Sequence, residues 1–222
     1  MDLSASIRNK LGHNYHELTD LEKLYYRLVI RPTLSADHRF FFEGALDIIG
    51  QMYLAERQAL FNAIIQFKPR RCFEVGTFTG GGSTFFLASA FEKIGAGKVI
   101  TLEPHPALFS LATAAYRTYL PHLLDHVEFI KGGDVEAFVP HIDPAEGVDA
   151  FFLDGAENAD QTLAQYRFFQ PHLHSGTVMM AHDWDTDKMA SVRPRVESDP
   201  QWETLLALDP PYSVGLVVLR RR

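Results

Sequence analysis

Apolar residues recur at steps of three and four through the first part of the chain, which is the spacing of one helix face. The first such stretch has Thr19 or Asp20 as its N-cap and Pro32 beyond its end, and consists of Leu18, Leu21, Leu24, Tyr25 and Leu28. A second stretch runs from Ala45 to Ile65 and ends at Lys68-Pro69. The pattern predicts a helical N-terminal extension over residues 1–68 that packs on, or caps, the rest of the chain.

From Arg70 onward, short apolar runs alternate with amphipathic stretches. The runs predict strands at Cys72–Val75, Lys98–Leu102, Val127–Ile130, Val148–Leu153 and Thr177–Ala181, and the stretches between them predict helices at Ser83–Ile94, Ala107–Tyr119 and Gln161–His172. Such an alternation, with strands that are apolar almost throughout, is typical of a parallel sheet covered by helices on both faces.

The last two apolar runs, Trp202–Leu208 and Ser213–Leu219, are separated only by Asp209-Pro-Pro-Tyr212. That connection is too short for a crossover helix, so the two runs should form an antiparallel hairpin at the end of the sheet. The sequence therefore predicts an α/β fold over residues 69–222, built on a doubly wound, mostly parallel sheet of seven strands.

Composition narrows the classes of partner. Of the 222 residues, 46% are hydrophobic and 22% are charged, and 28 acidic against 21 basic residues give a net charge of −7. An acidic chain is a poor match for a nucleic-acid backbone, and no apolar run approaches the ~18 residues that span a bilayer. Cys72 is the only cysteine, which excludes an intramolecular disulfide. With no signal-peptide pattern at the start, we expect a cytoplasmic protein with neither a nucleic-acid nor a membrane partner.

A glycine-rich turn follows the first predicted strand, in the stretch Glu74-Val-Gly76-Thr-Phe-Thr-Gly80-Gly-Gly-Ser83. Glycines at such a turn let the backbone approach a ligand closely, and the helix that begins there adds free N–H groups. In a doubly wound sheet this is a place where ligands bind. The spacing fails the Gly-x-Gly-x-x-Gly pattern of dinucleotide binders, which disfavours a nicotinamide cofactor.

Polar residues also end the strands that follow. Glu103, at the tip of the second strand, is suited to accept hydrogen bonds from both hydroxyls of a ribose. Gly133-Asp134 follows the third strand, Asp154 the fourth, and His182-Asp183 the fifth. Taken singly, each residue could be a helix cap or a solvated strand end. Their joint order along the sheet favours a site for a nucleoside cofactor.

At these residues the chain resembles the class I S-adenosylmethionine-dependent methyltransferases, in particular small-molecule O-methyltransferases related to the catechol, caffeoyl-CoA, sugar and antibiotic enzymes. The resemblance extends over about residues 45–222, including the terminal hairpin, and implies a Rossmann-like methyltransferase fold. It also implies that S-adenosylmethionine is bound by Glu74, Gly76, Thr77, Phe78, Gly80, Ser83, Glu103, Pro104, Asp134 and Asp154. Relatives are often dimers, so it further suggests a homodimer with the N-terminal helices as its interface.

The resemblance places the chemistry at Asp154 and His182. In the metal-dependent branch, Asp154 and an Asp-Asn or Asp-Asp pair hold a divalent cation, but here the pair is His182-Asp183. Two alternatives stay open: Mg²⁺ or another divalent cation on Asp154 and Asp183, which would activate an acceptor hydroxyl, or general-base catalysis by His182 without a metal. Trp184 belongs either to the acceptor pocket or to the core beneath the hairpin.

The sequence thus favours transfer of a methyl group from S-adenosylmethionine to a hydroxyl of a small molecule. An N-methyltransferase or other transferase on the same cofactor scaffold is one rival prediction. A catalytically inactive module that binds S-adenosylmethionine is the other. The two rivals share the cofactor site, so only turnover on an acceptor separates them.

Overall fold

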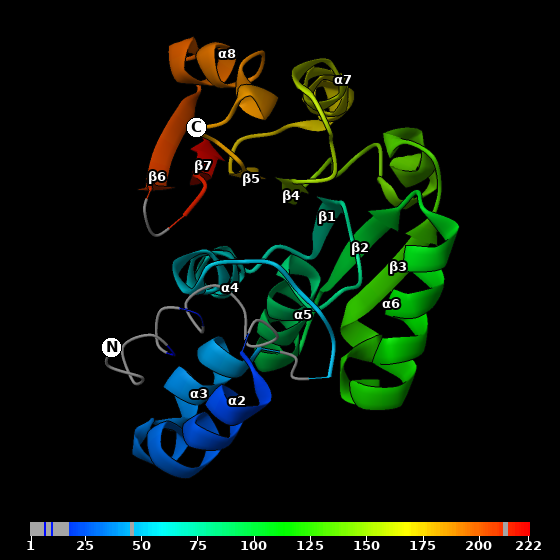
Figure 1. The fold of residues 1–222 in the computed structure, drawn as a ribbon. Helices are drawn as coiled ribbons and strands as arrows, with labels where there is room; N and C mark the ends of the chain where they lie inside the picture. The colour runs from blue at the N-terminus through cyan, green and yellow to red at the C-terminus, as the bar shows by residue number, and fades with distance from the viewer. Residues whose placement is uncertain (1–6, 8–9, 11–17, 45–46, 211–212) are drawn as a thin grey trace.

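The molecule is built on one seven-stranded sheet (Figure 1), in a computed structural model that describes Ile7, Lys10 and residues 18–44, 47–210 and 213–222. The strand order is β3-β2-β1-β4-β5-β7-β6, and only β7 runs opposite to the other six strands. The strands are β1 (Arg71–Val75), β2 (Lys98–Glu103), β3 (Val127–Lys131), β4 (Ala150–Leu153), β5 (Val178–His182), β6 (Trp202–Leu208) and β7 (Leu216–Arg221). This confirms the doubly wound sheet with its antiparallel terminal hairpin.

Helices cover both faces of the sheet, and each face has its own core. The helices are α2 (Asp20–Tyr25), α3 (Ala36–Glu43), α4 (Leu54–Phe67), α5 (Ser83–Ile94), α6 (Pro106–Tyr119), α7 (Ala159–Phe169) and α8 (Arg193–Ser198). Side chains of α4, α5 and α6 share one core with strand residues such as Cys72 and Phe152. Side chains of α7 and α8 share the other with residues such as Phe73 and Phe151. Among the described residues, no helix is long and apolar enough to cross a membrane.

The N-terminal region differs in part from the helices predicted for it. Thr19 caps α2 through a capping box with Glu22, as predicted, and a π-helix, η2 (Tyr26–Ile30), continues it. In Figure 1, α2 and α3 lie beyond α4 and α5, away from the strands, and Leu18, Tyr26 and Ile30 form a small separate core there. By contrast, α4 belongs to the main core. The domain boundary expected at residue 68 stays a prediction.

The prediction of one helix from Ala45 to Ile65 is wrong over residues 47–53, where the chain is not helical. Helix α4 begins only at Leu54, because the Glu56 carboxylate accepts a hydrogen bond from the Tyr53 N–H and so caps the helix there. Gly50 shows why residues 47–53 are held outside the helix. A Cβ on Gly50 would lie 2.1 Å from the carbonyl carbon of Gly81, so this segment packs directly on the glycine-rich turn.

The first strand of the terminal hairpin, β6, has the predicted bounds, but the second begins later than predicted, since β7 starts at Leu216 rather than Ser213. Ser213 and Val214 are occupied elsewhere: the Ser213 hydroxyl donates to the Glu56 carboxylate at 2.6 Å, and the Val214 N–H donates to the same oxygen at 3.2 Å. The segment just before β7 is thereby hydrogen-bonded to the start of α4.

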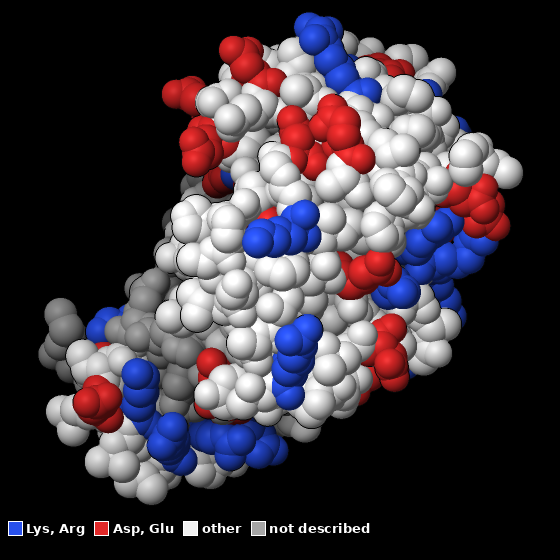
Figure 2. All heavy atoms as spheres, turned by 90° about the vertical axis from the view of Figure 1, so that its right-hand side faces the viewer, with Lys and Arg blue, Asp and Glu red and all other residues white. Residues whose placement is uncertain are grey.

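Acidic and basic side chains are interspersed on the face of the molecule that includes α6 (Figure 2). This distribution accords with the net charge of −7 and with ion pairs such as Lys98–Glu128 and Arg70–Glu146 on the surface. The expectations that nucleic acid is not a partner and that the chain forms a homodimer stay predictions.

Candidate active site

Two adjacent cavities open where the carboxyl ends of β1, β2, β4 and β5 meet. The first, which we call the His182 cavity, has a volume of ≈ 400 Å³ and contains Glu56, His182 and Asp183 in its wall. The second, the Glu103 cavity, has a volume of ≈ 510 Å³ and is lined by Glu103, Pro104, His105 and their neighbours. Gly76, Phe78 and Asp154 line both cavities. A ligand that extends past these three residues would occupy both spaces at once.

The turn between β1 and α5 separates the two cavities and leaves no room for larger side chains. Gly76 has φ +105°, and a Cβ there would lie 2.7 Å from the Cα of Gly155 in the loop after β4. Gly81 packs closely against the segment before α4. A Cβ on Gly81 would lie 2.3 Å from the carbonyl oxygen of Ile48, so a larger residue does not fit there. The glycine at position 81 is therefore required by the segment that packs on the turn.

Glu103 is almost fully buried and is fixed by backbone N–H groups. One carboxylate oxygen accepts from the Phe78 N–H and the other from the His105 N–H, each at 2.8 Å. Each oxygen keeps a lone pair for a further donor. This geometry suits a carboxylate that receives the two hydroxyls of a ribose.

Three of the predicted cofactor residues do not line either cavity. Glu74 is fully buried beneath the turn and accepts from the Thr84 hydroxyl at 2.6 Å. Gly80 packs against Tyr116, whose hydroxyl donates to the Gly80 carbonyl. Asp134 caps the 3₁₀ helix η5 (Val135–His141). The other predicted cofactor residues, Gly76, Thr77, Phe78, Ser83, Glu103, Pro104 and Asp154, line one or both cavities.

Burial raises the pKa of Glu74 to about 7, against the hydrogen bonds of the Ser83, Thr101 and Thr84 hydroxyls, which lower it. A buried carboxyl without a cationic partner favours its neutral form. Its other oxygen has no hydrogen-bond partner among the described residues. The residue before the glycines thus supports the turn from below and holds a proton over part of the neutral pH range.

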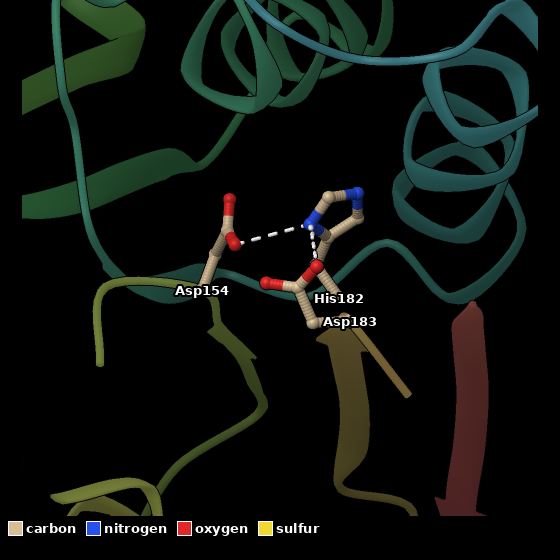
Figure 3. Close-up of side chains that lie close together, drawn as sticks. All are labelled: Asp154, His182 and Asp183. Carbon is tan, nitrogen blue, oxygen red and sulfur yellow. Dashed lines mark hydrogen bonds and ion pairs between the residues drawn. The ribbon is translucent and has the colours of Figure 1, made fainter. Parts of the chain in front are cut away.

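In the His182 cavity, the imidazole of His182 lies among three carboxylates. Two of them, Asp154 and Asp183, are drawn in Figure 3, and the third is Glu56. Its Nδ1 is 3.2 Å from Asp154 Oδ1 and 3.7 Å from Asp183 Oδ1, and its Nε2 is 3.1 Å from Glu56 Oε2. The three acids come from separate elements: Asp154 follows β4, Asp183 follows β5, and Glu56 lies in the first turn of α4. The sheet edge therefore brings together Asp154, His182 and Asp183, as the sequence predicted, and α4 adds a fourth group.

These contacts determine the charge state of the site. Burial alone would lower the pKa of His182, but hydrogen bonds to Asp154, Asp183 and Glu56 outweigh it and raise the pKa to about 12. Burial would raise the pKa of Asp183, but His182 and Lys188 lower it to about 2. At neutral pH the imidazole is a cation and Asp183 an anion, so the site carries a stabilised ion pair.

A second cation, Lys188, lies beside this pair. Its Nζ donates to Asp183 Oδ2 at 2.7 Å and to the Asp154 carbonyl oxygen at 2.5 Å, and it lies 3.3 Å from Asp154 Oδ1. Asp154, His182 and Asp183 bring one ligand atom each to within 4.8 Å of one another, which is close enough for a shared metal ion. The ammonium of Lys188 already lies between the two carboxylates, however, so this set does not fit a divalent cation as it stands.

The sequence analysis missed two residues of this site, Glu56 and Lys188. Glu56 had a detectable signal: it is an acid on the same helix face as the apolar residues Ala59, Leu60 and Ala63, and a buried acid needs a partner. Lys188 had none, because it lies in the short 3₁₀ helix η7 (Asp187–Met189), in a stretch without apolar periodicity. Only the fold of the loop after β5 brings it back to the sheet.

Comparison with known proteins identifies the family and the fold. The sequence model of a family described as a methyltransferase domain matches residues 73–184, just over half of the chain. No curated protein sequence matches the chain. Solved structures with a similar fold include an O-methyltransferase from Bacillus cereus in complex with SAH, with a TM-score of 0.63 and 16% identity over 92% of this chain and 98% of that one.

Two further solved structures have a similar fold. The O-methyltransferase TomG from Streptomyces achromogenes, involved in tomaymycin synthesis and solved in complex with SAM, has a TM-score of 0.60 and 14% identity over 92% of this chain and 99% of that one. The SAH-bound methyltransferase PaMTH1 from Podospora anserina has a TM-score of 0.58 and 16% identity over 99% of this chain and 94% of that one. At these identities the likeness establishes the fold.

Proposed function

Because this chain belongs to the methyltransferase-domain family, we propose that it transfers the methyl group of S-adenosylmethionine (SAM) to a hydroxyl oxygen of a small molecule. The observation that carries the proposal is the pair of adjoining cavities. One presents the Glu103 carboxylate and the other the His182 cluster, with Gly76, Phe78 and Asp154 common to both. The B. cereus and TomG structures, named as O-methyltransferases and solved with SAH and SAM, support the same cofactor and acceptor atom.

Glu103 would hold the ribose of the cofactor, and the glycine-rich turn would lie along its methionine part. Gly82 and Ser83, at the start of α5, line the His182 cavity, where the positive end of the helix favours a carboxylate. When bound, SAM supplies a methyl group on a positively charged sulfonium. The chain must then hold the acceptor oxygen in line with that methyl group and exclude competing orientations.

His182 and Asp154 would handle the proton of the acceptor hydroxyl. With the protein groups alone around it, a pKa of about 12 keeps the imidazole protonated. A sulfonium charge near the pair disfavours a second positive charge, so it would lower the pKa of His182 toward the range of a general base. The Asp154 carboxylate, 3.2 Å from Nδ1, fixes the ring orientation, with Nε2 directed at the Glu56 carboxylate of α4. We therefore assign proton uptake to the His182–Asp154 pair.

A divalent cation on Asp154 and Asp183 is the second candidate for activation of the acceptor. The spacing of ligand atoms in the Asp154, His182 and Asp183 cluster favours it, and a bound cation would lower the pKa of the acceptor hydroxyl. The ion pairs of Lys188 with the same two carboxylates weigh against it. Metal-free transfer is therefore the version that we propose.

Calorimetric titration of SAM and of SAH into the purified full-length chain tests the cofactor assignment. Binding should be followed by a screen of phenols, catechols and sugar alcohols for SAH release. We expect micromolar binding of both nucleosides and turnover with at least one hydroxyl acceptor. Failure of both nucleosides to bind would contradict the assignment, and turnover only on amines would favour an N-methyltransferase.

A further inference from the structure

Lys188 is held in the site by three acceptors. Its ammonium has three N–H donors, and its neighbours are Asp183 Oδ2, the carbonyl oxygen of Asp154 and Asp154 Oδ1, at 2.7, 2.5 and 3.3 Å. The side chain is only 15% exposed. This is the arrangement of a structural counter-ion rather than of a lysine on the surface.

The backbone on either side of Lys188 is anchored, which keeps the ammonium in place. The Thr186 hydroxyl donates to the Asp183 carbonyl oxygen at 2.9 Å and accepts from the Lys188 N–H at 3.3 Å. Met189, the next residue, is fully buried in the core beneath the sheet. Asp183 itself has φ +58°, a conformation that costs free energy for a residue other than glycine. The fold thus maintains a strained residue and an anchored loop around this cation.

The position of Lys188 is the one that a metal ion would need. Mg²⁺ binds carboxylate oxygens at ~2.0–2.1 Å, and two cations a few ångströms apart in a partly buried site repel each other strongly. A divalent ion shared by Asp154 and Asp183 would therefore have to displace the ammonium. Displacement would break both ion pairs and leave a charged group to be solvated elsewhere.

We propose that the Lys188 ammonium takes the place of a divalent cation between Asp154 and Asp183, so that the intact chain excludes metal from its methyl-transfer site. The inference rests on the proposed function for its role in the reaction. Lys188 is a positioning residue: it balances the charge of the two carboxylates and orients Asp154, which in turn holds His182. Asp154 and Asp183 each place a carboxylate oxygen within 4.8 Å of the other, and the Lys188 ammonium lies between the two carboxylates.

Titration of Mn²⁺ alone, followed by electron paramagnetic resonance, tests the inference without cofactor or acceptor. The full-length wild-type chain should bind no stoichiometric Mn²⁺. Lys188→Met, which keeps an unbranched side chain one atom shorter and removes the charge, should bind one Mn²⁺ per chain. The double variant K188M/D183N should lose that ion, because one carboxylate ligand is gone. Lys98→Met, which removes a cation from the exposed Lys98–Glu128 pair, is the matched control and should behave as wild type.

Two results would overturn the inference: one Mn²⁺ bound by the wild type and lost in Asp183→Asn, or no gain of Mn²⁺ in a folded Lys188 variant. Circular dichroism and SAH binding establish that each variant is folded. If Lys188→Met does not fold, Lys188→Gln keeps two N–H donors for the carboxylates and replaces it in the comparison.

Turnover gives a second readout and separates this inference from the proposed function. Wild-type methyl transfer should be unchanged by a chelator. Lys188→Met should lose roughly 10- to 100-fold in kcat, the cost typical of groups that orient a catalytic side chain, and Mg²⁺ or Mn²⁺ should restore part of it. A merely structural lysine would show no metal rescue. If no acceptor is ever methylated, the proposed function fails, while the Mn²⁺ titration still decides the role of Lys188.

Discussion

The two cavities of the site are assembled in different ways. The Glu103 cavity is formed by the ends of neighbouring strands and their turns, and its carboxylate is fixed by backbone N–H groups of Phe78 and His105. The His182 cavity depends on side chains from α4, β4, β5 and the loop after β5. The first is set by local backbone geometry, which a motif encodes. The second is set by tertiary contacts between ionised groups, so it should respond far more strongly to single substitutions and to pH.

The largest expected difference between the roles of the two cavities comes from His182→Asn. Loss of the proton acceptor should reduce kcat by roughly 10²- to 10⁴-fold, whereas the affinity for SAH should stay within about threefold because Glu103 is untouched. Single-turnover kinetics and calorimetry on the same preparation measure both. His174→Asn is the control, because His174 pairs with Asp149 and lines neither cavity. An unchanged kcat would remove His182 from the reaction.

Glu103→Ala should have the opposite effect. Each hydrogen bond from a hydroxyl to a charged carboxylate contributes about 1.5–3 kcal/mol, so loss of both ribose contacts should weaken SAM binding by 10²-fold or more. Glu157→Ala, which removes a carboxylate from the wall of the same cavity, is the matched control and should bind SAM nearly as well. Equal affinity in Glu103→Ala and wild type would contradict the ribose assignment.

Glu74 links the glycine-rich turn to the pH dependence of stability. Its folded pKa of about 7 lies above the ordinary value of 4.5, so the folded chain holds a proton that the unfolded chain has released. Stability should therefore fall as pH rises from 4.5 to about 7 and then level off, by roughly 3 kcal/mol in total. Glu74→Gln should flatten this slope in urea denaturation, while Glu128→Gln, on the surface, should keep it. A slope unchanged in Glu74→Gln would show that another group causes it.

Sequence reasoning was most successful where a feature is local. The five parallel strands, the hairpin and the acid or histidine at each strand end were predicted because apolar runs and turn residues determine them within a few positions. Helix α4 was predicted to begin too early, since nothing near Gly50 in the sequence indicates that its Cα faces the glycine-rich turn. Trp184, a candidate for the acceptor pocket, lies in the core with Val217 and Leu219.

The two site residues that were not predicted, Glu56 and Lys188, were also missed because their contacts are tertiary. Glu56 and Lys188 reach His182 and Asp183 only after α4 and the loop after β5 have packed against the sheet. No spacing within the chain encodes these contacts, because the partners are separated by helices and strands whose packing determines the distance. Much of the lining of the Glu103 cavity was therefore predictable, and the charge balance of the His182 cavity was not.

Gly81→Ala tests the junction between the N-terminal segment and the turn. The new Cβ would lie 2.3 Å from the Ile48 carbonyl oxygen, so one of the two backbones must move. We expect a loss of about 1–3 kcal/mol in stability and weaker SAH binding, measured by thermal unfolding with and without SAH. Gly133→Ala, where nothing lies within 4 Å of the added Cβ, is the control and should change little. Equal melting temperatures of the two variants would contradict the close approach.

The smallest expected effect concerns two residues with positive φ, Lys68 at 48° and Phe78 at 53°. Lys68 ends α4 on the surface, away from both cavities. Lys68→Gly should therefore stabilise the chain by about 0.5–1 kcal/mol, after the extra entropy that glycine loses on folding, and leave SAH affinity unchanged. Phe78→Gly relieves similar strain but removes a side chain that lines both cavities, so it should weaken SAH binding. If Phe78→Gly binds SAH as tightly as Lys68→Gly, the strain at Phe78 serves the turn alone; weaker binding would mean that the strain positions the ring for the cofactor.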